Sequence, residues 1–317
     1  MKKLAAFLTL FLPLLAHGHS GPPVPTPLNL EQLTAAFGWD LDKAEITTQK
    51  IDDGLYVLFG MGGNIAVSLG DNGVLIVDDQ FPQLMPKIEA AIGALGGSGV
   101  DFAINTHWHF DHAEGNLALG PKGTWLVAQA NSRAMMLDDH IINLVSVSYE
   151  QKAYPAAALP VITFDDNMQF HFNGQKIDLL HFGPAHTTGD TAVIFTGSNA
   201  VHLGDVFNNA GYPFIDAGNG GQLTGAISFC EAVLQRIDEN TTVIPGHGPV
   251  TDYQTLRDYI YMLTTVRERM MALIEAGASL EEVYAANVTR EFDEKFGDNS
   301  GFINRAYMSL THRIVDR

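Results

Sequence analysis

The sequence predicts an α/β fold in which two β-sheets pack together and helices cover their outer faces. Short apolar segments of strand length dominate both halves of the chain, and turn signals such as Asn-Gly separate them. Segments with apolar residues at helical spacing lie between and after these strands. Because a sheet and an amphipathic helix must each bury an apolar face, this order of elements favours stacked layers.

The first half predicts four strands and one helix. The strands are Leu55–Phe59, 65–69, 74–77 and 102–104, and the helix is 84–95. Asn72 and Gly73 indicate a tight hairpin between the second and third strands, since both residue types accept a positive φ. Leu84, Ile88 and Ile92 recur at the spacing of one helix face.

The second half also alternates short strands with helices, and it ends in helices. Its predicted strands are 125–127, Met168 to Phe172, 177–181, 192–196, 200–203 and Thr242–Ile244, and its predicted helices are 131–138 and 224–237. From Asp252 onward only helical spacing remains, which predicts a helical extension over 256–317. Residues 139–160 match neither pattern, and a connection of that length is typical of a lid or binding loop.

The N-terminus has the pattern of a secretory signal peptide. Two lysines precede an apolar stretch from Leu4 to Ala16, and small residues follow. This stretch is too short to span a bilayer, so we expect a signal peptide over 1–20, cleaved after Gly18 or Ser20, and no membrane attachment afterwards. A Pro-rich leader is expected over 21–45. The mature protein is therefore predicted to be periplasmic or secreted.

Composition narrows the possible partners. The formal net charge is −18, so the surface would repel a phosphate backbone and nucleic acid is not an expected partner. The single cysteine, Cys230, cannot form an internal disulfide, which suits a bacterial periplasm better than a disulfide-rich scaffold. The chain also contains neither a P-loop nor a G-x-S-x-G motif.

Four residues of metal-binding types fall within six positions shortly after the predicted strand 102–104. The run reads HWHFDH and contains His107, His109, Asp111 and His112. Histidine and aspartate are the ligands that zinc uses when sulfur is absent. Only 12 histidines occur in the chain and three of them lie here, which favours a metal-binding loop over a chance polar loop.

Three further candidate ligands stand in turns after later strands. They are His186 in GPAHT, Asp205 in HLGD and His247 in PGHGP. Together with the H-x-H-x-D-H run, these motifs resemble the metallo-β-lactamase superfamily, over roughly residues 46 to 255. The resemblance implies an αββα four-layer sandwich as the catalytic domain, 46–255, with the C-terminal helical extension packed on it.

The resemblance also implies a two-metal hydrolase. One metal would be held by His107, His109 and His186, the other by Asp111, His112 and His247, and Asp205 would bridge them. Two divalent ions, zinc or alternatively iron or manganese, would lower the pKa of a shared water and present it as hydroxide to a carbonyl. Asp111 is the expected catalytic residue because it can orient this hydroxide. The implied substrates are esters, thioesters, lactones or β-lactams.

Two departures from the lactamase pattern bear on the substrate. Asp205 stands where many β-lactamases of the superfamily carry Cys or Ser. In this respect the chain resembles glyoxalase II-like members, which carry Asp at this position. No Lys or Arg occurs between Lys176 and Arg236, although relatives commonly place a basic residue just after the Asp205 position. Without such a residue, bidentate binding of a substrate carboxylate is not expected there. The sequence therefore predicts weak β-lactamase activity.

Several other residues are candidates for roles near the site. The apolar pocket wall could include Met61, Phe81, Trp108, Phe110, Phe207, Tyr212 and Phe214. Each of these fits an ordinary core equally well, and only Trp108, between two ligands, is expected near the substrate. Asp78 could hydrogen-bond the ligand loop, the alternative being a plain turn residue. The remaining histidines outside the leader are expected to be structural or on the surface: His140, His171, His181, His202 and His312.

Two alternatives to hydrolysis remain open. Some members of this fold are iron-dependent oxidoreductases, and a sulfur dioxygenase-like site would hold a single iron. A periplasmic metal-binding protein without turnover would have the same ligands, because a fold does not fix a function. The sequence predicts a small-molecule substrate but does not identify it, and it leaves the oligomeric state open.

Overall fold

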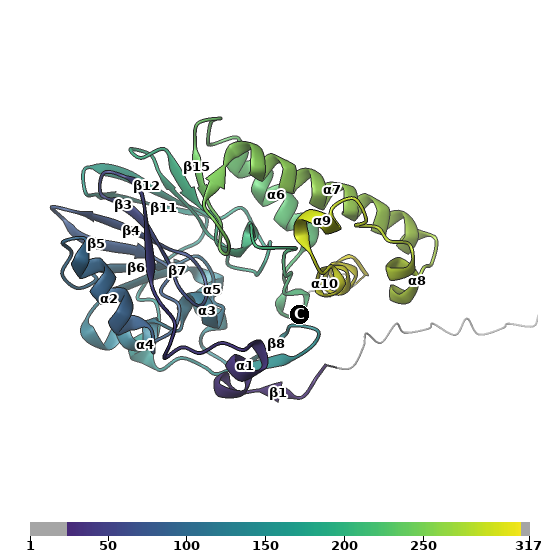
Figure 1. The fold of residues 1–317 in the computed structure, drawn as a ribbon, viewed down its shortest axis with the longest axis horizontal. Coiled ribbons are helices and arrows are strands. Elements are labelled where there is room, and N and C mark those ends of the chain that lie inside the picture. Colours follow the sequence, from purple (N-terminus) through teal and green to yellow (C-terminus); the bar gives the residue numbers. More distant parts are fainter. Residues whose placement is uncertain (1–23, 312–317) are drawn as a thin grey trace, which may run out of the picture.

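The computed structural model describes residues 24–311, and it shows a mixed α/β fold of stacked layers (Figure 1). The predicted signal peptide, 1–20, lies outside the described residues. The first sheet has the strand order β10-β7-β6-β5-β4-β3-β2. Its strands are β2 (Thr47–Asp52), β3 (Leu55–Phe59), β4 (Ile65–Gly70), β5 (Gly73–Val77), β6 (Phe102–Asn105), β7 (Trp125–Gln129) and β10 (Ile162–Phe164).

The second sheet contains the strands of the later half in the order β11-β12-β13-β14-β15-β16. They are β11 (Asn167–Phe172), β12 (Gln175–Leu180), β13 (Ala192–Phe195), β14 (Ala200–His202), β15 (Thr242–Ile244) and β16 (Thr251–Asp252). β14 pairs with β15 in parallel, and the other pairs in this sheet are antiparallel. In the first sheet, β5, β6, β7 and β10 run parallel to one another.

The two sheets face each other across an apolar layer. Leu55, Val57 and Ile104 of the first sheet belong to the same fully buried cluster as Ile177 and Phe195 of the second. Burying each side chain of this size stabilises the fold by about 1.5–3 kcal/mol. The alternation of inward and outward residues along β3 and β12 therefore determines which face of each sheet packs against the other sheet.

Helices cover the outer face of each sheet. On the first sheet the apolar cluster includes Ile88 and Ile92 of α2, and on the second it includes Phe229 of α6 and Leu263 of α7. The helices of the first half are α1 (Leu30–Phe37), α2 (Met85–Ala94), α3 (Phe110–Ala113), α4 (Asn116–Leu119) and α5 (Ala130–Met135), with 3-10 turns η1 (Gly120–Lys122) and η2 (Ala156–Ala158). The expected four-layer sandwich, helix, sheet, sheet, helix, is confirmed.

The C-terminal part is helical, as the spacing of its apolar residues predicts. Its elements, with those of the preceding loop, are η3 (Gly204–Val206), η4 (Ala217–Asn219), α6 (Leu223–Leu234), α7 (Tyr253–Glu275), α8 (Leu280–Ala285), α9 (Asp293–Phe296) and α10 (Ser300–Thr311). α7 begins at a cap in which Asp252 accepts the N–H of Thr255 at 2.8 Å. Across residues 24–311, no helix has both the length and the apolar character needed to cross a bilayer.

A third, small sheet was not predicted. It joins β1 (Pro27–Leu28), β9 (Ser148–Gln151) and β8 (His140–Asn143) in that order. The segment 21–45 therefore contributes a strand and a helix in addition to its Pro-rich part, and the segment 139–160 contains a hairpin. β2, at the edge of the first sheet, was also missed, because its residues TTQKID are mostly polar and exposed.

Candidate metal centre

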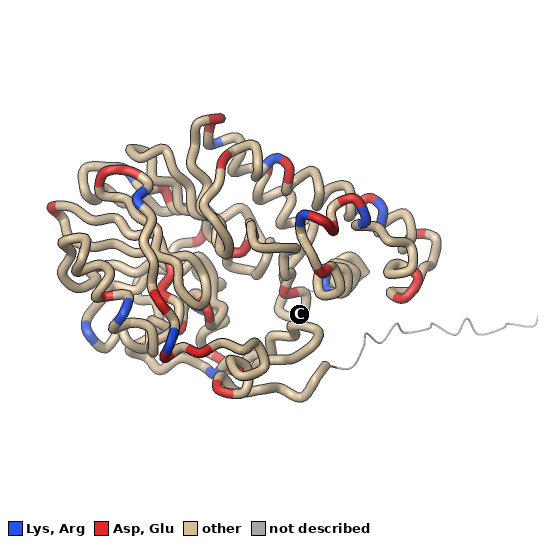
Figure 2. Tube along the Cα trace, in the orientation of Figure 1, with Lys and Arg blue, Asp and Glu red and all other residues tan. Residues whose placement is uncertain are grey.

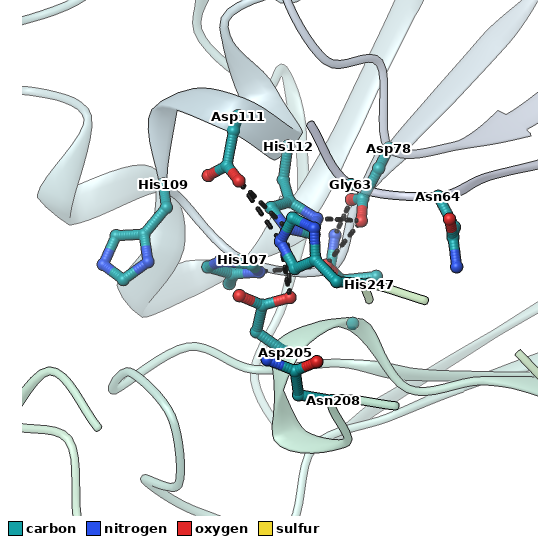
Figure 3. A network of polar contacts seen from close by, with 12 residues as sticks. Gly63, Asn64, Asp78, His107, His109, Asp111, His112, Asp205, Asn208 and His247 are labelled. Carbon is teal, nitrogen blue, oxygen red and sulfur yellow. Dashed lines mark hydrogen bonds and ion pairs between the residues drawn. The ribbon is translucent and has the colours of Figure 1, made fainter. Parts of the chain in front are cut away.

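The H-x-H-x-D-H run lies where β6 ends and α3 begins. His109 takes an extended conformation at the N-cap of α3, and Asp111 and His112 lie in this short helix. All four candidate ligands of the run are buried or nearly so. The turn from strand to helix thus aims four metal-binding side chains at one edge of the two sheets (Figure 3).

The other three candidate ligands come from the second sheet. His186 lies in the loop between β12 and β13, Asp205 in η3 after β14, and His247 in the turn after β15. Ligand atoms of these residues and of the run form three overlapping groups, within each of which all atoms lie within 4.8 Å of one another. The groups are His107, His109 and His186; His107, His112 and Asp205; and Asp111, His112 and His247. The structure therefore brings all seven predicted ligands together.

Neighbouring groups fix which nitrogen carries the proton in the first trio of histidines. His186 Nδ1 lies 2.7 Å from the carbonyl oxygen of Phe214, which can only accept, so Nδ1 must donate and Nε2 keeps its lone pair. His109 Nε2 lies 2.9 Å from a carboxylate oxygen of Asp216, so Nδ1 keeps the lone pair. These two lone-pair nitrogens face each other at 2.9 Å.

The third member of this trio has the same arrangement. Thr106 donates its hydroxyl proton to Asp78 at 2.8 Å, so its oxygen accepts from His107 Nδ1 at 3.0 Å. His107 Nε2 is then a buried lone pair without a hydrogen-bond partner in the described chain. Three inward lone pairs would repel one another, and a bound cation would stabilise them. These residues therefore fit a divalent metal ion.

The second group is built around His112 and His247. His112 Nδ1 donates to Asp78 at 2.7 Å, and its Nε2 donates to Oδ1 of Asp205 at 3.1 Å. Burial would lower the pKa of His112, but the carboxylates of Asp205, Asp111 and Asp78 outweigh this effect and hold it well above its usual value, and a bound cation would take the place of the Nε2 proton. His247 Nε2 lies 3.2 Å from Asp111 and 3.4 Å from the same Asp205 oxygen. Figure 3 shows Asp111 and Asp205 on opposite sides of these two rings. This set offers two imidazoles and two carboxylates to a second cation.

Asp205 lies between the two groups. Its Oδ1 faces His112 and His247, whereas its Oδ2 is 3.7 Å from His186 Nε2. One carboxylate oxygen is thus directed to each group. This orientation fits the bridging role that the resemblance implies for Asp205.

The electrostatics of the centre reflect many ionisable groups buried together. Burial and the neighbouring His112 lower the pKa of His107 well below its usual value. Burial would also lower the pKa of His247, but the carboxylates of Asp205 and Asp111 outweigh this effect and raise it to about 10. Burial would raise the pKa of Asp205, but His247 and His112 hold it well below the ordinary range. The centre is therefore strongly suited to bind a positive charge.

Asp78 supports the ligand loop, as the sequence suggested. Its carboxylate accepts from the backbone N–H of Thr106 at 2.7 Å as well as from His112. It adopts a φ of 64°, a left-handed conformation that is uncommon outside glycine. Such a conformation is kept only where surrounding contacts determine it, which here are the bonds to the ligand loop.

A second supporting carboxylate, Asp216, was not predicted. It accepts from His109 Nε2 and is itself held by the side-chain amide of Asn219 at 2.9 and 3.1 Å. Asp216 precedes η4 in a loop with no recognisable motif. Nothing in its local sequence could reveal a hydrogen bond to a residue 107 positions earlier.

The loop 60–63 approaches the centre closely. A Cβ atom on Gly63 would overlap the ring of His112, so only glycine fits at this position. The N–H of Gly63 donates to the carbonyl of Asp111 at 2.9 Å, which ties the loop to α3. The hairpin of the first sheet therefore forms one wall of the centre.

The expectation that Trp108 lies near the substrate is wrong. Its ring lies 4.7 Å from that of His109 and 5.2 Å from that of His140, but its side chain is fully buried and so does not face the open side of the centre. Phe81, Phe110 and Phe207 are also core residues, and Tyr212 is buried and donates to Asp293. Phe214, by contrast, is partly exposed beside the centre, 5.8 Å from the His186 ring and 6.1 Å from the His109 ring.

The remaining histidines and basic residues lie outside the ligand set. His202 is buried and bonds the carbonyl of Asn64, and His181 bonds that of Asp190. His171 is exposed on β11, and His312 lies outside the described residues. One basic residue, Arg305 of α10, comes near Asp216, but it is 4% exposed and its guanidinium donates to Asn304.

Solved structures of the same fold support this architecture. A metallo-beta-lactamase from Pontibacter korlensis superposes with a TM-score of 0.56 at 17% identity, covering 69% of this chain and 99% of that one. DIM-1 metallo-beta-lactamase gives 0.56 at 17%, covering 70% and 99%. The sec-alkylsulfatase Pisa1 from Pseudomonas sp. gives 0.66 at 13%, covering 84% of this chain but only 50% of that one. At these identities the likeness shows the fold alone.

Sequence comparison assigns the family. The family model of the metallo-beta-lactamase superfamily matches residues 62–275, which is more than half of the chain. The chain therefore belongs to the metallo-beta-lactamase superfamily. A search of curated protein sequences found no significant match.

Proposed function

We propose that this protein is an exported, binuclear-metal hydrolase that cleaves a small carbonyl substrate such as an ester, thioester, lactone or β-lactam. The observation that carries this proposal is the inward lone-pair geometry of His107, His109 and His186 beside a second group rich in carboxylates. Export is supported by the N-terminal pattern of residues 1–20, and the periplasm is the proposed location.

Divalent ions at the two groups, zinc in our proposal, would supply Lewis-acid activation of both the attacking water and the substrate carbonyl. Asp111 is the proposed catalytic residue, because its carboxylate borders both His247 and His112 and can accept a hydrogen bond from the attacking water. Asp205 would supply one carboxylate oxygen to each of the two ligand groups. Asp78 and Asp216 are positioning residues that fix the orientation of the His112 and His109 rings.

The environment of Asp205 argues against efficient β-lactam hydrolysis. Within residues 177–235 there is no Lys or Arg to bind a substrate carboxylate, and Arg305 is buried against other protein groups. Superfamily membership alone does not select a substrate. We therefore propose weak β-lactamase activity beside a different principal substrate.

Metal analysis combined with a substrate screen tests the proposal. We expect purified mature protein to contain two zinc ions per chain and to turn over at least one ester or lactone reporter. His107→Ala should lose both metal and activity, whereas His171→Ala, on the exposed face of β11, should keep both. A single iron per chain would favour the oxidoreductase alternative. Full metal loading without turnover over a broad panel would favour a binding protein, and unchanged turnover in a metal-depleted His107→Ala protein would refute the proposal.

A further inference from the structure

An open cavity lies directly beside the candidate metal centre. Its volume is about 620 Å³, within the range typical of small-molecule sites. His247 belongs both to the cavity wall and to the second ligand group. In Figure 3, Asn64, another wall residue, lies on the side of His247 away from His109, which places the cavity on the His247 side of the centre.

Five separate segments build the wall. They contribute Trp39 from the segment between α1 and β2, Gln49 from β2, Phe59 and Met61 from β3 and the loop after it, Ala210 from the loop after η3, and Pro249 after the His247 turn. None of the wall residues is Asp, Glu, Lys or Arg. The side-chain N–H groups of Asn64 are already donated to the carbonyls of Pro245 and Gly248, both at 2.9 Å. Apart from the side chains of Gln49 and His247, the cavity therefore offers mainly apolar and aromatic surface.

The position of Trp39 is fixed before any ligand arrives. Its ring packs against Phe37 and Phe81 at centroid distances of 5.2 and 6.0 Å, and its backbone N–H donates to the carbonyl of Thr34 at 2.8 Å. The chain just after it is held by Lys87, whose ammonium donates to the carbonyls of Asp42 at 2.6 Å and Ala44 at 2.7 Å. A wall held in this way needs little ordering when a ligand binds.

We propose that this cavity binds an uncharged aromatic or aliphatic group of the substrate, so that the natural substrates are neutral, hydrophobic carbonyl compounds. This inference rests on the proposed function and specifies its substrate class. The one ionisable wall residue, His247, is already paired with the carboxylates of Asp111 at 3.2 Å and Asp205 at 3.4 Å. A carboxylate placed against the rest of the wall would therefore lose its hydration without gaining a free basic partner. An apolar ring would instead be stabilised by burial against Trp39 and Met61.

Binding of a matched pair of probes tests the inference independently of turnover. The probes are 2-acetonaphthone, a neutral ketone, and 2-naphthoate, which carries a carboxylate on the same ring system. Titrated into the metal-free full chain, where no zinc ion can coordinate the carboxylate, the ketone should bind about tenfold more tightly than the carboxylate, a difference of about 1.4 kcal/mol. Equal or tighter binding of 2-naphthoate would overturn the inference.

Two variants and a control locate the binding. Trp39→Ala should weaken ketone binding about tenfold, the effect of losing one large aromatic contact, whereas Trp125→Ala, at a 55% exposed residue of β7, should leave it unchanged. Ala210→Lys, an exposed wall position, should strengthen 2-naphthoate binding and so reverse the preference. If Trp39→Ala folds poorly, as a circular dichroism spectrum would reveal, Ala210→Lys still provides the test. No change in either variant would contradict the proposal.

The outcomes separate this inference from the proposed function. If the probe preferences hold but no ester or lactone is hydrolysed, the proposed hydrolase activity fails and the binding site stands. If neutral and anionic esters are hydrolysed equally well and Trp39→Ala leaves KM unchanged, the hydrolase stands and the inference about its substrate class fails.

Discussion

At the level of single residues, the histidines of the centre are informative because each has one ring nitrogen committed to a known acceptor. Phe214, Asp216 and Asp78 accept from His186, His109 and His112 respectively. A ring oriented in this way directs its other nitrogen into the centre without any rotation of the ring. The supporting acceptors are therefore expected to matter for metal affinity nearly as much as the ligands themselves.

Replacement of Asp216 tests this expectation. Asp216→Ala removes the acceptor of His109 Nε2, so the ring can rotate or change tautomer, and we expect zinc affinity to fall about 10- to 100-fold. Competition with a chromogenic chelator measures the affinity. Asp71→Ala, in the exposed turn before β5, is the control and should bind zinc like the unmodified protein. Unchanged affinity in Asp216→Ala would show that His109 is oriented by other contacts.

Glu114 predicts a pH dependence of stability. Burial raises its pKa to about 7, despite the hydrogen bond that it accepts from Tyr149 at 2.7 Å. A carboxyl whose folded pKa lies above its unfolded value binds more protons when folded. Its contribution to stability is thus largest in acid and is lost as the pH rises from about 4.5 to about 7.

The matched substitution is Glu114→Gln, which keeps an acceptor for Tyr149 but cannot ionise. In metal-free protein we expect it to leave stability near pH 5 little changed and to raise it at pH 8 by about 2–3 kcal/mol. Urea unfolding at the two pH values measures the difference. A variant that is less stable than the unmodified protein at pH 8 would contradict the assigned pKa shift.

Among the elements, the loop after β3 leaves no space for a side chain at Gly63. Gly63→Ala would drive a methyl group into the His112 ring, so the loop or the ring must move. We expect lower zinc affinity and a loss of stability of about 1–3 kcal/mol, the usual cost of overpacking. Gly93→Ala in α2, where a Cβ meets no neighbour, should instead be stabilising by about 0.5–1 kcal/mol. Thermal unfolding and chelator competition on both variants check the pair.

Most elements could be predicted because their signals are local. Strands β3 to β6 and helices α2, α6 and α7 carry the required apolar period within their own residues, and all seven candidate ligands lie in the short loops, turns or helices that follow strands. β2, β8 and β9 were missed because polar side chains make up much of each strand. Asp216 and Trp39 lie beside residues that are distant in the sequence, His109 and the cavity wall respectively. No local sequence pattern predicts such contacts.

At the scale of the whole molecule, the centre joins the two sheets. His107, His109, Asp111 and His112 extend from the first sheet, and the other ligands extend from the second. Figure 2 shows Asp and Glu spread through both halves, and the sequence has 36 of them against 18 Lys and Arg, a net charge of −18. Positive metal ions would therefore connect two acidic halves.

Removal of metal should accordingly lower global stability. A ligand that binds only the folded state stabilises it by about 4 kcal/mol at a thousandfold excess over its Kd. We expect a chelator to lower the Tm by several degrees and added zinc to restore it. Tris(2-carboxyethyl)phosphine, a reductant, should leave the Tm unchanged, because the single cysteine cannot form an internal disulfide. A Tm that does not respond to the chelator would show that metal does not join the two halves.

The most direct test of the two-metal centre is a zinc titration of metal-free protein followed by isothermal calorimetry. The unmodified protein should bind two ions per chain. His186→Ala and His247→Ala each remove a ligand from a different group, so each should lose one high-affinity ion and retain the other. A single ion per chain in the unmodified protein, or loss of the same ion in both variants, would contradict a binuclear centre.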